Sequence, residues 1–317
     1  MIELIVLIEF LKNILDIRTT LLNAQIYNKQ SDNIYFDYPL KQIDFLNKTS
    51  KDKNKNNPNA QNKILNKNKF FDFDIDENVI SAKNVLIKEI NGETIYSKNI
   101  EEKKPIASIT KLMTALITFE NYKNLKEKIK ISEKIFENKS ILENHTGLKN
   151  GDVMTLEDLL NISLISSSNI ASLAIAENLG IGKFIELMNN KAKELNLKDT
   201  QFQDPIGISP QNVSTLKDLS LLTEYILKEY PLIFEFSIKP AFNIDKNRIV
   251  YNTNHLIERY KKYIIGSKTG FTEEAAGCLI MLVKINNSPI IFVGILGSRN
   301  RGADAEYILK KLIDYYK

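Results

Sequence analysis

The sequence predicts an α/β fold of the α+β type, in which a mostly antiparallel sheet packs against helices. Segments with the pattern of strands lie near both ends of the folded part, at 82–88 and 93–98 and again in three segments near the C-terminus. Asn91-Gly92, between the first two strands, is a strong signal for a tight hairpin turn. Segments with apolar residues at helical spacing fill the middle of the chain. Strands at both ends with helices between them favour one sheet covered by helices.

Each further element follows from the same periodicities. Leu112, Ala115, Leu116 and Phe119 recur at helical spacing after Ser108 and predict a helix over 111–122. Other helices are predicted at 155–166, 170–178, 183–195, 215–228 and 303–316, and the late strands at 264–269, 278–285 and 290–297.

The chain divides by composition into three parts. Residues 44–69 are rich in Asn and Lys and poor in apolar residues, which predicts a disordered linker. Residues 1–43 precede it, and we expect the catalytic domain to occupy 70–317. The apolar start, 1–11, is broken by two glutamates and is too short to span a bilayer. It is open to three interpretations: a degenerate signal or anchor, an ordinary amphipathic helix, or a mis-assigned start codon.

Charge and composition exclude several classes of function. Apolar residues make up 43% and charged residues 26%, as in ordinary soluble domains. The net charge is +4, but the segment 44–69 holds seven Lys against two Asp, a local +5 that leaves the rest near −1. No basic surface for nucleic acid is therefore expected outside that segment.

Metal and histidine chemistry are also unpromising. The single cysteine, Cys278, lies in an apolar run and is expected to be buried, and it forms no intrachain disulfide. His145 and His255 are far apart in the sequence, so we expect no metal site and no cofactor. The sequence lacks a G-x-S-x-G elbow. A serine enzyme without a catalytic histidine needs another base, and lysine is the usual one.

The segment Ser108–Lys111 (SITK) supplies a serine and a lysine at the predicted start of a helix. Positions i and i+3 share one helix face, and the helix N-terminus favours a developing negative charge. Burial beside another cation would lower the pKa of Lys111 and let it accept the serine proton. The spacing alone is weak evidence in this Lys-rich chain, because Ser50–Lys53 and Ser214–Lys217 share it.

Two further segments strengthen the interpretation. Ser167-Ser168-Asn169 lies between two predicted helices, where a hydroxyl and an amide could relay a proton and hold a substrate amide, although helix capping explains Ser167 equally well. Lys268-Thr269-Gly270 lies on a predicted strand. There a cation and a hydroxyl would bind a terminal carboxylate, and the glycine would let the backbone approach a ligand.

The three segments in this order resemble the S-x-x-K, S-x-N and K-[ST]-G motifs of penicillin-binding proteins and class A β-lactamases. Residues 107–115, 147–169 and 266–278 are most similar to the D-alanyl-D-alanine carboxypeptidases of peptidase family S11, and the segment 251–254 also fits. The resemblance covers about residues 80–316. It implies a β-lactamase/transpeptidase-like fold, with a mostly helical subdomain that carries the S-x-N motif.

The resemblance also implies a role for each residue of the site. Ser108 would be the acylated nucleophile and Lys111 its general base; Ser167 would pass the proton to the leaving amine. Asn169 would hold Lys111 and the substrate amide, and Lys268 would set the electrostatics of the two serines. The carboxylate would be bound by Thr269, Gly270 would line the substrate site, and the backbone N–H groups of Ser108 and Phe271 would form the oxyanion hole. Arg301 falls where the family keeps a carboxylate-orienting arginine, with Arg299 as the alternative.

The function predicted from this resemblance is a serine-type D-alanyl-D-alanine carboxypeptidase, acting on peptidoglycan stem peptides that end in D-Ala-D-Ala and inhibited by β-lactams. Endopeptidase or transpeptidase activity would use the same residues. A β-lactamase and a catalytically silent wall-binding module are the alternatives. The first is disfavoured because 198–210 offers no E-x-x-L-N segment, and the second because all three motifs are intact. We expect the protein to be extracytoplasmic, either secreted or attached to the membrane through its N-terminus.

Overall fold

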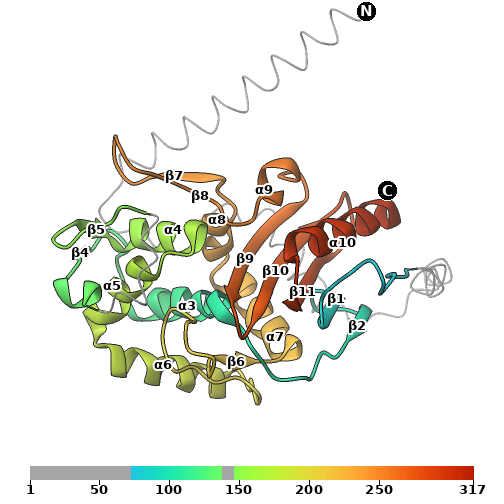
Figure 1. The fold of residues 1–317 in the computed structure, drawn as a ribbon, viewed down its shortest axis with the longest axis horizontal. Helices are drawn as coiled ribbons and strands as arrows, with labels where there is room; N and C mark the ends of the chain where they lie inside the picture. The colour runs from blue at the N-terminus through green and yellow to red at the C-terminus, as the bar shows by residue number, and fades with distance from the viewer. Residues whose placement is uncertain (1–72, 138–145) are drawn as a thin grey trace, which may run out of the picture. The chain divides into compact units, whose positions relative to one another are not determined.

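A five-stranded antiparallel sheet with the strand order β2-β1-β11-β10-β9 lies at the centre of the domain (Figure 1). The computed structural model describes residues 73–137 and 146–317. The described residues belong to one compact unit. The predicted N-terminal segment 1–43, the predicted linker 44–69 and His145 lie outside the described residues. The strands are β1 (Asn84–Glu89), β2 (Thr94–Lys98), β9 (Ile264–Thr272), β10 (Ala276–Lys284) and β11 (Ile290–Ser298).

The sheet is buried on both faces, as the continuous apolar runs of its central strands require. In β10, Met281 and Val283 point into one apolar cluster, whereas Ile280 and Leu282 point into the other. Successive side chains of a strand alternate between faces, so an all-apolar strand can supply two cores at once. Each fully buried aliphatic side chain of this kind contributes about 1.5–3 kcal/mol.

Helices cover the two faces of the sheet. Helix α10 (Arg301–Tyr316) lies along β10 and β11 on one side, where it buries Ile308, Leu309 and Leu312 (Figure 1). Helix α7 (Leu216–Glu229) packs against β11 and β1 from the other side.

The remaining helices form a subdomain beside the sheet (Figure 1). They are α3 (Lys111–Asn121), α4 (Leu156–Ser166), α5 (Asn169–Leu179), α6 (Ile181–Glu194) and α8 (Leu232–Ser237). Helix α4 begins with a capping box: the Thr155 hydroxyl accepts from the Asp158 N–H, and the Asp158 carboxylate accepts from the Thr155 N–H. The apolar faces of these helices join one face of the sheet in a single core.

Short elements connect these layers. Three two-stranded ladders pair β3 with β6, β4 with β5, and β7 with β8. The bounds are β3 (Lys104–Pro105), β4 (Lys128–Lys130), β5 (Val153–Thr155), β6 (Val213–Ser214), β7 (Ala241–Asn243) and β8 (Ile249–Tyr251), with the 3₁₀ helices η3 (Ala107–Thr110) and η4 (Glu133–Phe136) and the short helix α9 (Leu256–Arg259).

The predicted architecture is confirmed, and the ends of the predicted helices and strands differ from the observed ends by no more than three residues. The strand predicted at 264–269, for example, runs on to Thr272 as β9. Asn91 adopts a positive φ of 56° in the predicted hairpin turn. Cys278 is fully buried, as expected. Helices α8 and α9 were not predicted. Among the described residues, no helix is both long and apolar enough to cross a membrane.

Candidate active site

Ser108 and Lys111 lie in direct contact at the start of α3. Lys111 is the first residue of α3, as predicted, and Ser108 lies just before it in the 3₁₀ turn η3, which was not predicted. A 3₁₀ helix has three residues per turn and therefore aligns positions i and i+3. This alignment brings Lys111 Nζ to 2.9 Å from Ser108 Oγ.

The Lys111 ammonium is completely removed from solvent. Its Nζ also contacts the Asn169 Oδ1 at 2.9 Å and the backbone carbonyl oxygen of Ile206 at 2.6 Å. Burial lowers the pKa of Lys111 to about 7, although the negative charge of Asp204 acts in the opposite direction. Near neutral pH the amine can therefore exist without its extra proton. A neutral amine donates two hydrogen bonds, and the two oxygen acceptors can take both, which leaves its lone pair for the Ser108 hydroxyl.

Ser167 and Asn169 lie at the junction between α4 and α5. Ser167 ends α4 in the left-handed conformation, with φ 61°. Ser168, rather than Ser167, caps α5, because its side chain accepts from the Ala171 N–H. Ser167 is thus free of the capping role that the sequence allowed for it. Its hydroxyl accepts instead from Lys268 Nζ at 2.9 Å.

Lys268 lies on β9, as predicted, and its side chain is buried. Its Nζ also donates to the backbone carbonyl of Thr269 at 2.9 Å. Burial lowers its pKa well below the ordinary value, and the nearby charges of Lys111 and Arg301 lower it further. Because the charge of Lys111 disfavours a charge on Lys268, the protonation of one amine depends on that of the other.

The next residues of β9 form the edge of the site. Thr269 is buried, and its Oγ1 lies 2.5 Å from the Oγ1 of Thr253. A Cβ placed on Gly270 would lie 3.0 Å from the backbone nitrogen of Ser108. In the structure, Gly270 lies close to the backbone of the nucleophile turn. Phe271 exposes 63% of its surface.

The structure distinguishes the two candidate arginines. Arg301, the first residue of α10, is half-buried, and its charge acts on both Lys268 and Cys278. Burial lowers the pKa of Arg301. Within residues 73–137 and 146–317 its guanidinium forms no hydrogen bond or ion pair. Arg299 is exposed to solvent.

The loop 204–212 contributes contacts that the sequence did not predict. The Ile206 carbonyl receives Lys111 Nζ, and the Pro205 carbonyl receives Thr114 Oγ1 at 2.6 Å. Backbone carbonyls carry no signature of residue type, so no motif could have pointed to them.

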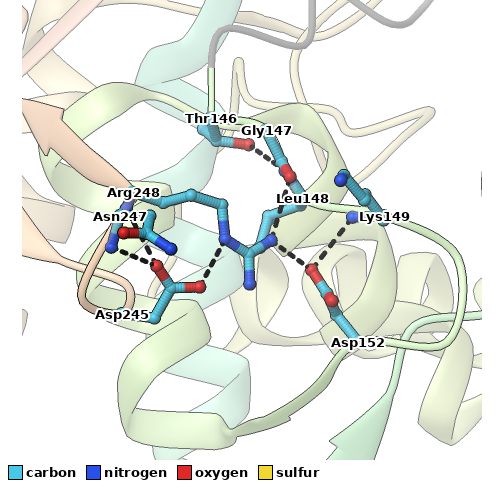
Figure 2. Close-up of polar contacts among 8 residues, drawn as sticks. All are labelled: Thr146, Gly147, Leu148, Lys149, Asp152, Asp245, Asn247 and Arg248. Atoms are coloured by element: carbon cyan, nitrogen blue, oxygen red, sulfur yellow. Dashed lines mark hydrogen bonds and ion pairs between the residues drawn. The ribbon is translucent and has the colours of Figure 1, made fainter.

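The β7–β8 hairpin forms a second unpredicted connection. Figure 2 shows the Arg248 side chain between the hairpin and the loop 146–152. Its Nη1 donates to the Gly147 carbonyl at 2.9 Å and to Asp152 Oδ2 at 2.5 Å, while its Nε donates to Asp245 Oδ2 at 2.7 Å. Beyond the hairpin, the Thr253 N–H donates to the carbonyl of Ile165 in α4.

The structure therefore gathers the predicted residues into two hydrogen-bonded groups, Ser108–Lys111–Asn169 and Ser167–Lys268. The charges of Lys111 and Lys268 act on each other, and Thr269 and Gly270 follow Lys268 on β9. The copy of the S-x-x-K spacing at 214–217 lies apart in the start of α7, where Thr215 is the helix cap. The copy at 50–53 lies outside the described residues. No group of side chains suited to a metal ion occurs in the described part of the chain. A hydroxyl next to an amine of lowered pKa is an arrangement suited to nucleophilic catalysis.

Comparison with known proteins agrees with this arrangement. The family D-alanyl-D-alanine carboxypeptidase, Peptidase S11, matches residues 72–299. The D-alanyl-D-alanine endopeptidase of Pseudomonas aeruginosa is 34% identical over 73% of this chain and 76% of its own. The D-alanyl-D-alanine carboxypeptidase DacF of Bacillus subtilis is 34% identical over 73% of this chain and 60% of its own.

Solved structures show the same fold. Penicillin-binding protein D2 from Listeria monocytogenes, in its cefotaxime-bound form, has a TM-score of 0.67 and 28% identity, and the match covers 75% of this chain and 98% of that one. Penicillin-binding protein 5 from Haemophilus influenzae has a TM-score of 0.68 at 22% identity, covering 75% of this chain and 72% of that one. The fold is that of the penicillin-binding transpeptidases, and the chain belongs to the S11 family of D-alanyl-D-alanine peptidases.

Proposed function

We propose that this protein is a serine D-alanyl-D-alanine carboxypeptidase that acts on peptidoglycan stem peptides through an acyl-enzyme on Ser108. The observation that carries the proposal is the 2.9 Å contact between Ser108 Oγ and the buried Nζ of Lys111, whose pKa is lowered to about 7. Membership of the S11 family supports the same reaction class.

In the acylation step, Ser108 Oγ attacks the carbonyl carbon of the penultimate D-alanine and gives its proton to the neutral Lys111 amine. The backbone N–H groups of Ser108 and Phe271 stabilise the oxyanion. The C–N bond of the last residue then breaks. The proton that Lys111 accepted is relayed through the Ser167 hydroxyl, which lies in contact with Lys268, to the leaving amine, and Lys111 is neutral again. D-Alanine departs, and the peptide remains as an ester on Ser108.

In the deacylation step, a water molecule attacks the ester carbonyl and gives a proton to the neutral Lys111 amine. The ester bond breaks, Ser108 recovers its hydroxyl proton, and the shortened peptide leaves as a carboxylic acid. Asn169 keeps Lys111 oriented in both steps through its Oδ1. An amine replaces the water if the reaction is a transpeptidation.

The substrate carboxylate binds at the edge of β9. Thr269 supplies a hydroxyl there, and Arg301 supplies a half-buried guanidinium that makes no hydrogen bond or ion pair within the described residues. A guanidinium without a protein partner is suited to a carboxylate that arrives with the substrate. The Arg299 side chain is exposed to solvent and lacks the partial burial of Arg301.

DD-endopeptidase activity is the second candidate. The relatives from Pseudomonas aeruginosa and Escherichia coli, 34% and 35% identical to this chain, are both D-alanyl-D-alanine endopeptidases. An endopeptidase attacks the same kind of carbonyl, but its leaving amine belongs to a cross-linked second peptide. Either substrate lies outside the cytoplasm, where peptidoglycan is assembled, so the proposal places the protein in the cell envelope.

The test is mass spectrometry of the intact protein after incubation with benzylpenicillin, on wild type and Ser108→Ala side by side. A penicilloyl adduct that persists on wild type and is absent from the variant is the expected result. Rapid loss of the adduct with hydrolysis of the drug would point to a β-lactamase, and no adduct on either protein would point to a wall-binding module.

The balance between the two peptidase activities is measured separately. Purified uncross-linked pentapeptide and cross-linked dimer are digested in parallel, and free D-alanine and monomeric muropeptide are quantified. Release of D-alanine as the faster reaction supports the carboxypeptidase, whereas faster cleavage of the dimer assigns the protein as an endopeptidase.

A further inference from the structure

Asp204 organises the loop that lies against the nucleophile. Its Oδ1 accepts from the backbone N–H of Ile206 at 2.8 Å and of Gly207 at 2.5 Å. Its Oδ2 accepts from the N–H of Ser209 at 2.7 Å, and Oδ1 makes a longer contact of 3.4 Å with the N–H of Ile208. Across the described ranges the carboxylate forms no salt bridge with a lysine or arginine; its partners are these backbone N–H groups and, at 3.4 Å, the Asn212 side-chain amide.

This arrangement fixes the direction of the Ile206 carbonyl. The oxygen receives Lys111 Nζ at 2.6 Å and lies 3.4 Å from Ser108 Oγ. Because the N–H groups on both sides of this carbonyl bind one carboxylate oxygen, the peptide units around it cannot rotate independently. Asn212 closes the loop by donating from Nδ2 to the Asp204 carbonyl at 2.8 Å.

The charge of Asp204 also acts on the Ser108–Lys111 pair. The other charged groups that face this cluster are Lys268 on β9 and Arg301 on α10, and both are positive. Asp204 is the acidic group whose charge raises the pKa of Lys111, against the larger effect of burial. It therefore balances a site in which the remaining nearby charges are cationic.

We propose that Asp204 is a positioning residue of the active site, which orients the Ile206 carbonyl toward Lys111 and sets the protonation of the Ser108–Lys111 pair by its negative charge. The proposal rests on the proposed role of Ser108 as nucleophile and Lys111 as base. Asp204 touches neither residue directly, so it acts through the loop and through its electric field.

The sign of the effect follows from the chemistry. The neutral amine of Lys111 is the reactive form, so acylation is slow below its pKa and reaches a plateau above it. Removal of the Asp204 charge lowers that pKa. The part of the pH profile in which the acylation rate rises with pH, its acid limb, therefore moves to lower pH. Separately, loss of the contacts that orient the Ile206 carbonyl lowers the maximal acylation rate, the plateau.

The experiment measures the second-order rate constant of acylation by a fluorescent penicillin between pH 5 and 9 in the full-length protein. Two neutral variants, Asp204→Asn and Asp204→Ser, are compared with the charge-retaining Asp204→Glu. We expect the neutral variants to lower the plateau about tenfold and to shift the limb down by about half a pH unit or more. Asp204→Glu returns the limb toward the wild-type position.

Asp218→Asn is the matched control. Asp218 also accepts from a backbone N–H, that of Asp199 at 2.8 Å, but its charge is not among those that act on Lys111. We expect this variant to leave the limb unmoved. If Asp204→Asn and Asp204→Ser fold and their acid limb lies at the same pH as in wild type, the proposal is overturned, whether or not their plateau is lower. If wild type itself is not acylated at Ser108, the proposed function fails and the inference fails with it.

Discussion

At the scale of single residues, the central feature of the site is the lowered pKa of the Lys111 amine, about 7, which lets the amine lose its charge near neutral pH. Lys111 is wholly buried, and its amine contacts oxygen atoms that accept hydrogen bonds. Asp204, the acid whose charge raises the pKa of Lys111, binds backbone N–H groups and not the lysine itself. A surface lysine would remain charged at neutral pH and could not take a proton. The burial of Lys111 is therefore what makes it a base.

The first prediction concerns pH. Because the pKa of Lys111 is lowered to about 7, acylation of Ser108 should rise with pH up to about that value and then level off. Below it, the rate should fall about tenfold for each pH unit as the amine becomes protonated. Stopped-flow or gel-based labelling with a fluorescent penicillin measures the profile, and a flat profile between pH 5 and 8 would contradict the assignment of Lys111 as base.

The second prediction separates the two arginines. Arg301→Gln should lower kcat/KM for a peptide with a free C-terminal carboxylate about 10- to 100-fold, because a charge-assisted hydrogen bond is lost. Arg299→Gln, at an exposed position, should change it little. Steady-state assays of D-alanine release from both variants give the answer, and equal losses would show that Arg301 has no special role.

Residue type explains what could be predicted at this scale. Ser108, Lys111, Ser167 and Lys268 carry reactive groups in recognisable segments, and the structure brings them together. The contact of Lys111 with a backbone carbonyl could not be predicted, since every residue has one. The role of Asp204 was hidden for a related reason: its partners are backbone N–H groups, which any turn supplies.

At the scale of elements, periodicity predicted the long helices and strands but not the conformations at their junctions. The 3₁₀ turn η3 aligns Ser108 with Lys111, and the left-handed Ser167 turns the chain between α4 and α5. Both are local backbone states that sequence patterns do not specify for serine. Helix α8 was missed because its six residues form a short apolar run, which fits a strand or a helix equally well.

The third prediction concerns the β7–β8 hairpin. Arg248 joins the hairpin to the loop 146–152 through contacts with Asp152, Asp245 and the Gly147 carbonyl (Figure 2). Arg248→Met should reduce the free energy of unfolding by about 1–3 kcal/mol, because it leaves these partners without their donor. Urea unfolding followed by circular dichroism measures the change.

An exposed ion pair provides the control for this prediction. The side chains of Lys228 and Glu229 expose 74% and 41% of their surface, so Lys228→Met should alter stability by less than about 0.5 kcal/mol. A loss at Arg248 no larger than the loss at Lys228 would mean that the hairpin is held by its apolar contacts alone.

At the scale of the whole molecule, the site lies where the sheet, the helical subdomain and the loop 204–212 meet. The sheet contributes Lys268 on β9, and the helical subdomain contributes Ser167 between α4 and α5 and Ser108 before α3. The loop contributes the Ile206 carbonyl that contacts Lys111. The order of the strands could not be read from the sequence, because pairing β1 with β11 joins the two ends of the domain. The site is thus assembled only when distant segments pack together.

The last prediction tests this assembly at the tightest contact. Gly207 has a φ of +83°, and a Cβ there would lie 2.0 Å from the carbonyl oxygen of Ala107, the residue before the nucleophile. Gly207→Ala must therefore push the loop 204–212 away from the nucleophile turn or strain both, so we expect loss of acylation and a fall in stability of about 3 kcal/mol or more. Gly182, inside α6, has open space around its Cβ position, and Gly182→Ala should instead stabilise the protein by about 0.5–1 kcal/mol with acylation unchanged. Penicillin labelling and thermal unfolding of the two variants distinguish a general intolerance of substitution from a specific contact: if Gly207→Ala labels at the wild-type rate, the packing of this loop on Ser108 is not what holds the site together.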